Sequence, residues 1–282
     1  LKFESTLIPS IVNPLFDTLL SRLNPLTMDL SWLDRLASCM QKLCDTLDSN
    51  DEACALREMV FLQSIVLWVN SSLSSSKWDP VHDVEAGLRI YEALIDSMCK
   101  SLRVPDKEED ALLKECINAE VVHNAVLPKL VRAVSRWKPK LDDDQKVDNP
   151  LNLWILPWLP YINDDSMLGS LLDDVRRHLK KTLSFLSKTV SDDVGFVRSC
   201  LSTLFPWKRL FDEAIMFEMT SNTISPRFAR SLAQMTICID PAVQSWEHMR
   251  ILFECYESGV MSTDDFVALI DGEVLPAWAR TL

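Results

Sequence analysis

The sequence has 282 residues, of which 48% are hydrophobic and 25% charged, and its formal net charge is −12. A chain of this length can bury a substantial core, whereas its acidic balance opposes sequence-independent binding to a nucleic-acid backbone, which needs a positive surface. Only 5 glycines occur, which argues against an all-β protein full of tight turns and against glycine-rich phosphate loops.

Apolar residues recur at helical spacing along nearly the whole chain. The sequence predicts helices over residues 6–23, 30–48, 52–73, 83–103, 107–136 with a break near Pro128, 168–190, 192–203, 206–219, 226–238, 243–257 and 263–282. The helix over 168–190 is the clearest, because one apolar stripe runs through Leu168, Leu172, Val175, Leu179, Leu183, Leu186 and Val190. Sustained strand alternation is absent. The prediction is therefore an all-α protein, an array of antiparallel helices without significant β-sheet, with a division into two packed lobes left open.

The charged segment 138–150 is the predicted seam between two helical parts. These are an N-terminal part, residues 1–140, and a C-terminal part, residues 141–282, which carries most of the Pro/Trp motifs described below. We expect both to form one continuous domain of a longer protein, because the chain begins without Met and without a signal-peptide pattern. No uncharged apolar run approaches the roughly 18 residues of a membrane span, so no membrane partner is expected.

Residue types that commonly carry catalysis or hold metals show no matching pattern. The 8 cysteines include no CxxC pair, and none of the 4 histidines shares a short ligand spacing with a cysteine. Nucleophile, Walker and dinucleotide motifs are absent. Asp-Asp pairs at 164–165, 192–193 and 264–265 stand at expected helix starts, with Ser191 and Ser262 as candidate N-caps. We expect reduced core cysteines, no metal, no cofactor, no small-molecule ligand and no enzymatic activity.

Two local basic features contrast with the acidic chain. Residues 121–141 contain no acid, and the run "RRHLKK" at 176–181 is the second feature. Either could contact RNA phosphates or an acidic protein helix; the alternative is a solvated face or intramolecular ion pairs with the many carboxylates. The candidate partner or RNA contacts are Lys129, Arg132, Arg136, Arg176, Arg177, Lys180 and Lys181.

Tryptophan is abundant, and several of the 9 tryptophans stand beside proline at expected helix ends. Proline is tolerated in the first helical turn, and an aromatic beside it can hold the turn against the next helix. We interpret these positions as corners of a helical bundle rather than a groove for an aromatic ligand. The structural motif comprises Trp137, Pro150, Trp154, Pro157, Trp158, Pro160, Pro206, Trp207, Pro276 and Trp278. Within it, 149–150 should form a turn, 154–159 a short buried helix and Pro160 a corner.

The order of these corners resembles a known family. "SRWKP" followed by "NPLNLWILPWLPYI", then "LLDDVRRHLKKTLSFL", "LFPWKRLF", "TISPRFARSL", "CIDPAVQSWEHM" and "VMSTDDFVALIDGEVLPAWARTL", are similar to successive segments of the tuftelin-interacting proteins. These are G-patch spliceosome-disassembly factors with the domain named after GC-rich sequence DNA-binding factor. The resemblance covers roughly residues 125–282. Leu153 departs from it, because the family usually has His before the tryptophan that is Trp154 here.

The resemblance implies a nuclear protein of pre-mRNA splicing. Full-length members use a G-patch to activate a DEAH-box RNA helicase that dismantles the intron-lariat spliceosome. This glycine-poor chain contains no G-patch, so it would be a non-catalytic scaffold that docks the activator on the spliceosome. Implied partners are spliceosomal proteins and other subunits of the disassembly complex, including another protein with the same domain type. The alternative is a direct RNA-binding helical module that uses the two basic faces.

Overall fold

The computed structural model describes residues 18, 20, 23, 26, 29–44, 64–101, 114–143, 146–234 and 246–280, with the backbone alone at 40, 43, 44 and 98–101. Within these ranges every regular element is a helix, and the one extended pairing is an isolated antiparallel bridge between Leu141 and Val147. The predicted all-α fold is confirmed. Most of the helix predicted over 6–23, and parts of those predicted over 52–73, 107–136, 226–238 and 243–257, lie outside the described residues.

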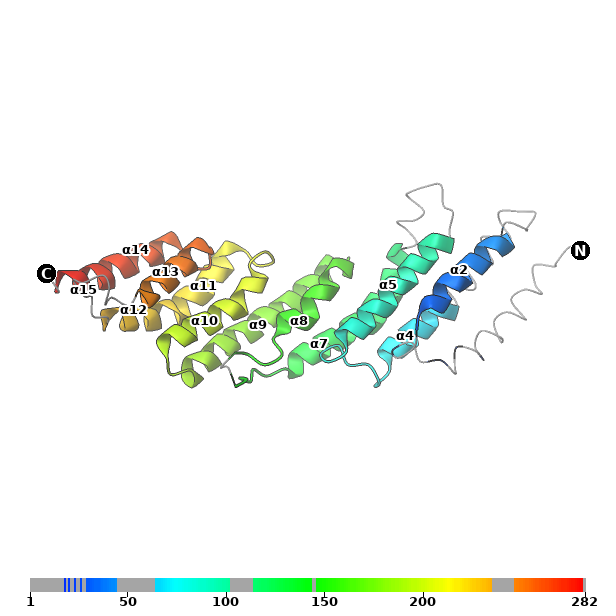
Figure 1. Cartoon of the computed structure of the whole chain (residues 1–282), viewed down its shortest axis with the longest axis horizontal. Coiled ribbons are helices and arrows are strands. Elements are labelled where there is room, and N and C mark those ends of the chain that lie inside the picture. The colour runs from blue at the N-terminus through cyan, green and yellow to red at the C-terminus, as the bar shows by residue number, and fades with distance from the viewer. Residues whose placement is uncertain are drawn as a thin grey trace, which may run out of the picture. The chain divides into compact units, whose positions relative to one another are not determined.

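The described helices follow one another along the chain in the order that Figure 1 shows. Segments labelled η interrupt or extend several of them. These are 3₁₀ helices, whose hydrogen bonds join residues three apart, or π-helices, whose hydrogen bonds join residues five apart. In chain order the elements are α2 (Ser31–Cys44), α4 (Leu67–Ser74), α5 (Val84–Ser101), η2 (Asn118–Val126), α7 (Leu127–Arg136), α8 (Leu151–Ile155), η3 (Leu156–Tyr161), α9 (Asp165–Thr189), α10 (Asp193–Leu204), η4 (Phe205–Trp207), α11 (Glu213–Thr223), α12 (Ser225–Ala233), α13 (Glu247–Glu257), α14 (Thr263–Leu269), η5 (Ile270–Val274) and α15 (Leu275–Ala279).

The chain divides into two compact units that alternate along the sequence. Unit 1 contains Leu1–Arg136 and Leu153–Leu171, and unit 2 contains Trp137–Asn152 and Leu172–Leu282. The chain therefore passes from one unit to the other three times. Because the units alternate in this way, the predicted boundary between residues 140 and 141 stays a prediction.

The core of unit 1 is an aromatic cluster between helices. The Trp158 ring contacts the rings of Trp78, at 5.9 Å between centroids, and of Tyr91, at 6.1 Å. The Trp78 indole N–H donates to the Asp83 carbonyl at 3.0 Å, and its ring lies against Gly87 on α5. A Cβ at position 87 would come within 2.8 Å of that ring, so glycine is what lets the indole pack here.

The core of unit 2 follows the predicted stripe of α9. Five residues of the stripe lie after Leu172, and each is no more than 2% exposed: Val175, Leu179, Leu183, Leu186 and Val190.

Helix α9 begins three residues earlier than predicted, because the Asp164 carboxylate accepts the N–H groups of Ser166 and Met167, both at 2.9 Å.

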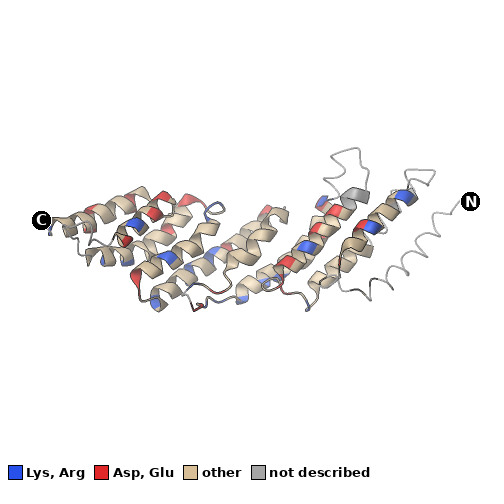
Figure 2. Cartoon of the chain, viewed as in Figure 1, with Lys and Arg blue, Asp and Glu red and all other residues tan. Residues whose placement is uncertain are grey.

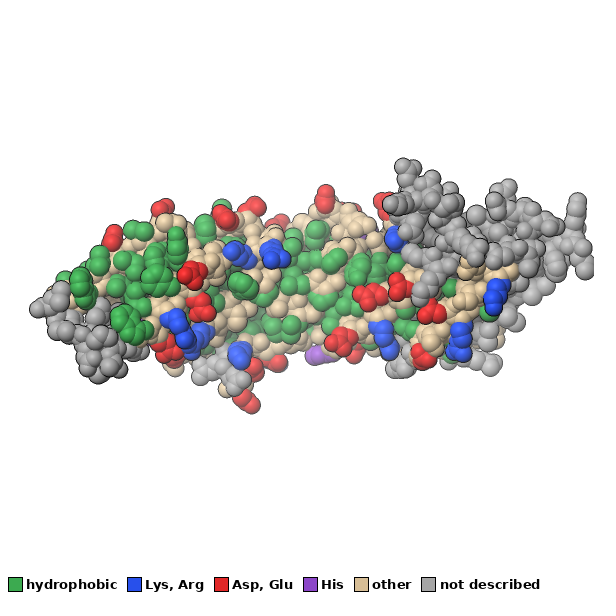
Figure 3. All heavy atoms as spheres, turned by 45° about the horizontal axis from the view of Figure 1, so that its top comes forward, with side chains coloured by type: hydrophobic (Ala, Val, Ile, Leu, Met, Phe, Trp, Pro, Cys, Tyr) green, Lys and Arg blue, Asp and Glu red, His purple; other side chains and the backbone are tan. Residues whose placement is uncertain are grey.

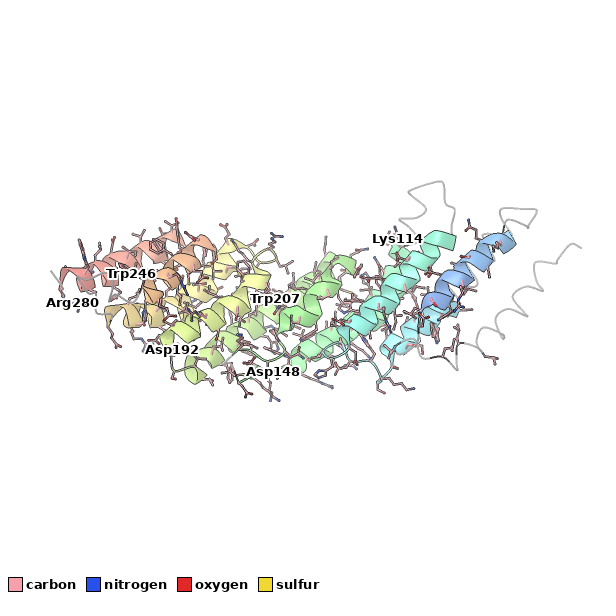
Figure 4. The ribbon with its side chains drawn as sticks, in the orientation of Figure 1. Lys114, Asp148, Asp192, Trp207, Trp246 and Arg280 are labelled. Atoms are coloured by element: carbon pink, nitrogen blue, oxygen red, sulfur yellow. The ribbon has the colours of Figure 1, made fainter. Side chains whose placement is uncertain are left out.

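Two other predicted helix starts can be compared with the structure. Ser262 caps α14 as predicted, accepting the Asp265 N–H at 3.1 Å. The prediction of Ser191 for α10 is wrong: the neighbouring Asp192, labelled in Figure 4, has the extended backbone of a cap, and its carboxylate accepts the Gly195 N–H. Aspartate and serine cap helices about equally well, so the sequence could not rank these two neighbours.

Two prolines, Pro128, where a break was predicted, and Pro276, follow π-helical turns. Both occur in the tripeptide Val-Leu-Pro, and in each the leucine N–H donates five residues back, from Leu127 to Val122 and from Leu275 to Ile270. Proline crowds the carbonyl four residues earlier in a regular helix, and the extra residue of a π turn gives that carbonyl room. The helix therefore continues through η2 into α7, and the predicted break near Pro128 does not occur.

Candidate interaction surfaces

The Pro/Trp motifs mostly form buried corners. Trp154, Trp158 and Trp207 are 0% exposed, and the Trp137 indole donates to the Asn149 carbonyl at 3.1 Å. Figure 4 labels Trp207 within unit 2. The prolines lie beside them at the surface: Pro150, Pro157 and Pro206 are half-buried, and Pro160 and Pro276 are exposed.

The segment "NPLNLWILPWLPYI" contains more structure than predicted. Asn149 has a φ of 45°, which makes the expected turn, and the helix α8 starts at Leu151. From Leu156 the helix tightens into the 3₁₀ element η3, which includes Pro157 and Pro160. Leu153, where the family usually has His, is 57% exposed, so its side chain takes no part in the core.

The basic face of α7 is partly used inside unit 1. The Lys129 ammonium donates to the Ser75 carbonyl and, at 2.8 Å, to the Trp78 carbonyl, and it lies 5.1 Å above the Trp78 ring. Burial lowers the pKa of Lys129. Arg132 and Arg136 are exposed and make no ion pair within the described residues. Lys129 therefore fits the structural alternative, whereas the two arginines remain available to a partner.

The basic run of α9, blue in Figure 2, is also partly used inside its own unit. Arg176 and Lys180 both bind the Glu218 carboxylate of α11, at 2.9 and 2.7 Å, and their hydrogen bonds hold its pKa below the usual value. Arg177 pairs with Asp174 on the same helix. Lys181 is exposed and has no such pair in the described part of the chain. The role of these four residues as partner contacts stays a prediction.

Arg227 on α12 makes several hydrogen bonds within unit 2, and no pattern in the sequence predicts them. Its guanidinium donates to Asp193 at 2.6 Å and to the carbonyls of Ser187 at 3.0 Å and Val190 at 2.6 Å, and it lies 4.3 Å above the Phe196 ring. Arg227 thus satisfies free carbonyls at the end of α9 and holds the start of α10. Its partners lie 34 to 40 residues away in sequence, beyond the reach of local patterns.

A shallow polar depression lies next to Arg227. It has two adjoining parts of about 260 and 360 Å³, and their lining includes Lys188, Arg230, Ser187 and Gln234. Lys188 makes no ion pair in the described ranges, and the Arg230 Nε donates only a long 3.4 Å bond to the Pro226 carbonyl of its own helix. The depression is open to solvent, and its lining also includes the Asp193 carboxylate.

The last described helices present what we call the C-terminal apolar surface, formed by Phe253, Tyr256, Phe266, Val267, Leu275 and Trp278. Phe253 is 46% exposed, Val267 and Leu275 also 46%, and Trp278 51%. The Phe266 ring lies 5.4 Å from that of Phe253 and 4.4 Å from that of Tyr256, which joins α13 to α14. Figure 3 shows hydrophobic side chains gathered over these elements. Trp278 thus departs from the expected buried corner.

Acidic side chains surround this surface. Glu254, Glu257, Asp264 and Asp271 are exposed, and none makes an ion pair within the described residues. Figure 2 shows acidic positions on α13 and α14. Residues 246–280 thus carry a net negative charge, and these four carboxylates have no ion-pair partner among the described residues.

The cysteines and histidines form no reactive group where they can be described. Cys200 and Cys255 are buried, and burial raises the pKa of both thiols, that of Cys255 to about 12. Cys39 and Cys116 are exposed, unlike the predicted core cysteines. Within the described ranges no three His, Cys, Asp or Glu side chains come together to hold a metal, and no helix is long and apolar enough to cross a membrane.

Comparison with known proteins finds one family and several distant relatives. A family model described as GC-rich sequence DNA-binding factor-like protein matches residues 3–282. The chain is 29% identical over 135 residues to the septin and tuftelin-interacting protein 1 homolog of Dictyostelium discoideum, covering 48% of this chain and 12% of that protein. It is 27% identical over 172 residues to septin-interacting protein 1 of Drosophila melanogaster, covering 61% and 18%.

A third relative is a G-patch domain-containing protein of Schizosaccharomyces pombe. It is 27% identical over 198 residues, which cover 70% of this chain and 23% of that protein. The chain therefore spans less than a quarter of the length of each of these relatives. The resemblance to tuftelin-interacting proteins stated from the motifs is confirmed.

Proposed function

The chain belongs to the GC-rich sequence DNA-binding factor-like family, and we propose that it is a non-catalytic protein-interaction scaffold of a nuclear pre-mRNA splicing factor. The factor takes part in disassembly of the intron-lariat spliceosome. The chain docks the activator of a DEAH-box RNA helicase on the spliceosome, while the G-patch that binds the helicase lies outside this chain. The two relatives named for septin or tuftelin interaction and the third named for a G-patch support this proposal.

The observation that carries the proposal is the C-terminal apolar surface. Large exposed apolar patches on folded domains mark interaction sites, because leaving contiguous apolar area in water is unfavourable. Here α13, α14 and α15 each expose aromatic or aliphatic side chains, and the rings of Phe253, Phe266 and Tyr256 join α13 to α14. Aromatic residues are also the side chains most enriched at protein–protein contacts.

The proposed partners are spliceosomal proteins and subunits of the disassembly complex, including another protein with the same domain type. The family's name refers to DNA, but the net charge of −12 speaks against binding to any nucleic-acid backbone through bulk electrostatics. Direct RNA binding through the basic faces is also less supported. Lys129, Arg176 and Lys180 donate hydrogen bonds to groups of their own unit.

A pulldown from nuclear extract tests the proposal. The immobilised chain should enrich spliceosomal proteins, identified by mass spectrometry, over a helical bait of equal size and net charge from outside the family. Enrichment of spliceosomal proteins equal to that of the control bait would contradict the proposed function. Filter binding at low salt should show no RNA affinity; binding that weakens steeply with salt would favour the RNA-binding alternative instead.

A further inference from the structure

We propose that the C-terminal apolar surface binds a basic amphipathic helix of a partner protein. This inference rests on the proposed scaffold function and adds the place and the chemistry of one contact. It is carried by the distribution of apolar residues on α14 to α15, by the uncompensated acids around them and by the geometry of the rings.

The helical run from α14 through η5 to α15 is apolar on two sides. Leu269, Val274 and Ala277 are buried against the unit, at 5%, 9% and 3% exposure. On the same run Val267, Leu275 and Trp278 are about half exposed. A surface helix normally has one apolar stripe and a polar outer face, whereas a helix that is apolar on both sides is normally covered on both. Within the part of the chain that the structure describes, the outer side of this run therefore has no cover.

The charge around the surface specifies the sign of the partner. Residues 246–280 contain seven acids and two bases. Two of the acids are engaged within the chain, Glu247 with Arg198 at 2.7 Å and Asp265 with the Ser221 hydroxyl. One of the two bases, Arg280, donates to the Ala233 carbonyl at 3.2 Å, at the C-terminal end labelled in Figure 4. The five remaining acids and Arg250 leave this stretch with a net negative charge, which favours a partner that brings Lys or Arg.

The ring geometry favours a helical partner over an extended one. Proline-rich segments dock in open slots between aromatic rings, but the rings of Tyr256 and Phe266 stack at 25° and 4.4 Å, which closes the slot between them. Strand addition requires a sheet edge with free backbone groups, and the described part of α13 to α15 is helical. A helix needs only apolar contacts spaced three or four residues apart, which the paired elements α13 and α14 offer.

Defined peptides test this proposal by fluorescence anisotropy with the whole chain. The probe is a labelled amphipathic peptide of about five helical turns, with Leu on one face and Lys on the other. A second peptide has Glu in place of every Lys, and a third is a Lys-flanked proline-rich peptide. We expect the Lys/Leu peptide to bind best, and to bind more weakly at high salt because screening shortens the reach of the acids.

Surface variants locate the site. The double variant Phe253→Ser, Trp278→Ser should weaken binding of the Lys/Leu peptide by about tenfold or more, as loss of central aromatic contacts does. Phe205→Ser is the matched control, because Phe205 is an aromatic residue of unit 2 that is 58% exposed but lies in η4. Asp271→Lys should weaken binding at low salt with a smaller effect at high salt. Leu275→Lys is a second variant of the C-terminal apolar surface. Circular dichroism verifies that each variant is folded.

Three results would overturn the proposal: equal affinity for the Lys and Glu peptides, tighter binding of the proline-rich peptide, or an unchanged affinity in both the double variant and Leu275→Lys. The outcome is separable from that of the scaffold function. If the double variant still captures spliceosomal proteins from extract as the unaltered chain does, this surface is not their contact and the scaffold function stands. If peptides bind as expected but the chain captures none, the splicing role fails while the surface remains a helix-binding site.

Discussion

Removing the Trp158 side chain should destabilise the protein strongly. Trp158 is 0% exposed, and its ring contacts those of Trp78, Tyr91 and Tyr161 at 5.9 to 6.4 Å between centroids. Truncation of a buried tryptophan to alanine leaves a cavity that such rigid neighbours cannot fill, and it costs about 3–5 kcal/mol. We therefore expect Trp158→Ala to lower the free energy of unfolding by about that amount.

A second substitution separates packing from hydrogen bonding. The Trp158 indole N–H is buried and has no acceptor in the described structure. Trp158→Phe keeps much of the apolar contact and removes this donor, whose unsatisfied burial costs about 1–3 kcal/mol. The lost side-chain volume lowers the free energy of unfolding, whereas removal of the unsatisfied donor raises it. We therefore expect a net decrease in the free energy of unfolding below about 2 kcal/mol.

Urea unfolding followed by circular dichroism measures both variants. Leu153→Ala is the matched control, because Leu153 belongs to the same segment but is 57% exposed, and it should change the free energy of unfolding by less than about 0.5 kcal/mol. A loss below about 1 kcal/mol for Trp158→Ala would show that the aromatic cluster is not the packed core of unit 1. A phenylalanine variant as unstable as the alanine variant would refute the argument about the indole donor.

Three further predictions concern other contacts. Gly87→Ala should destabilise by about 1–3 kcal/mol in urea unfolding, because its Cβ would come within 2.8 Å of the rigid Trp78 ring; an unchanged midpoint would show that the ring can move. Arg227→Ala should lower the free energy of unfolding by about 2–3 kcal/mol, somewhat less than for a fully buried ion pair because Asp193 is 33% exposed. Arg227→Lys should restore only part of this loss, because an ammonium cannot reproduce the several directed N–H groups of the guanidinium. Full recovery in the lysine variant would contradict that argument. Glu218→Gln should slightly lower stability at neutral pH and leave it unchanged in acid: the folded-state pKa of Glu218 is lowered by its bonds to Lys180 and Arg176, so its contribution is present above the unfolded pKa and lost as pH falls through the folded one. Thermal melts across pH check this, and an equal difference at every pH would contradict it.

Periodic and capping signals accounted for much of the fold. The three- and four-residue spacing of α9 identified side chains that are buried in unit 2, because the helical period fixes which residues share a face. Ser262 was found from its place before two acids. The π turns before Pro128 and Pro276 were not predicted, because the extra residue of a π turn has no sequence pattern of its own; at Pro128 the proline alone had predicted a break.

Local motifs could not distinguish burial from exposure at the Pro/Trp corners. "FPW" and "LPAW" have the same chemistry, yet Trp207 is 0% and Trp278 51% exposed. The difference depends on which helices pack around each corner, and this is set by contacts distant in sequence. Arg227 was missed for the same reason, because its partners on α9 and α10 become neighbours only after folding.

The charges favour an acidic partner-binding surface over the basic faces of α7 and α9. In a chain with 41 acids and 29 bases, a cation that meets a carboxylate or a helix end on folding is held there, as Arg176, Lys180 and Arg227 are. Basic runs in such a sequence are therefore weak evidence for an external partner. Among the described residues, the carboxylates of Glu254, Glu257, Asp264 and Asp271 make no ion pair, and they occur in α13, α14 and η5 together with exposed aromatic rings. A partner that covers those rings must also bring the missing positive charge, so charge and apolar contact together select for a basic amphipathic helix.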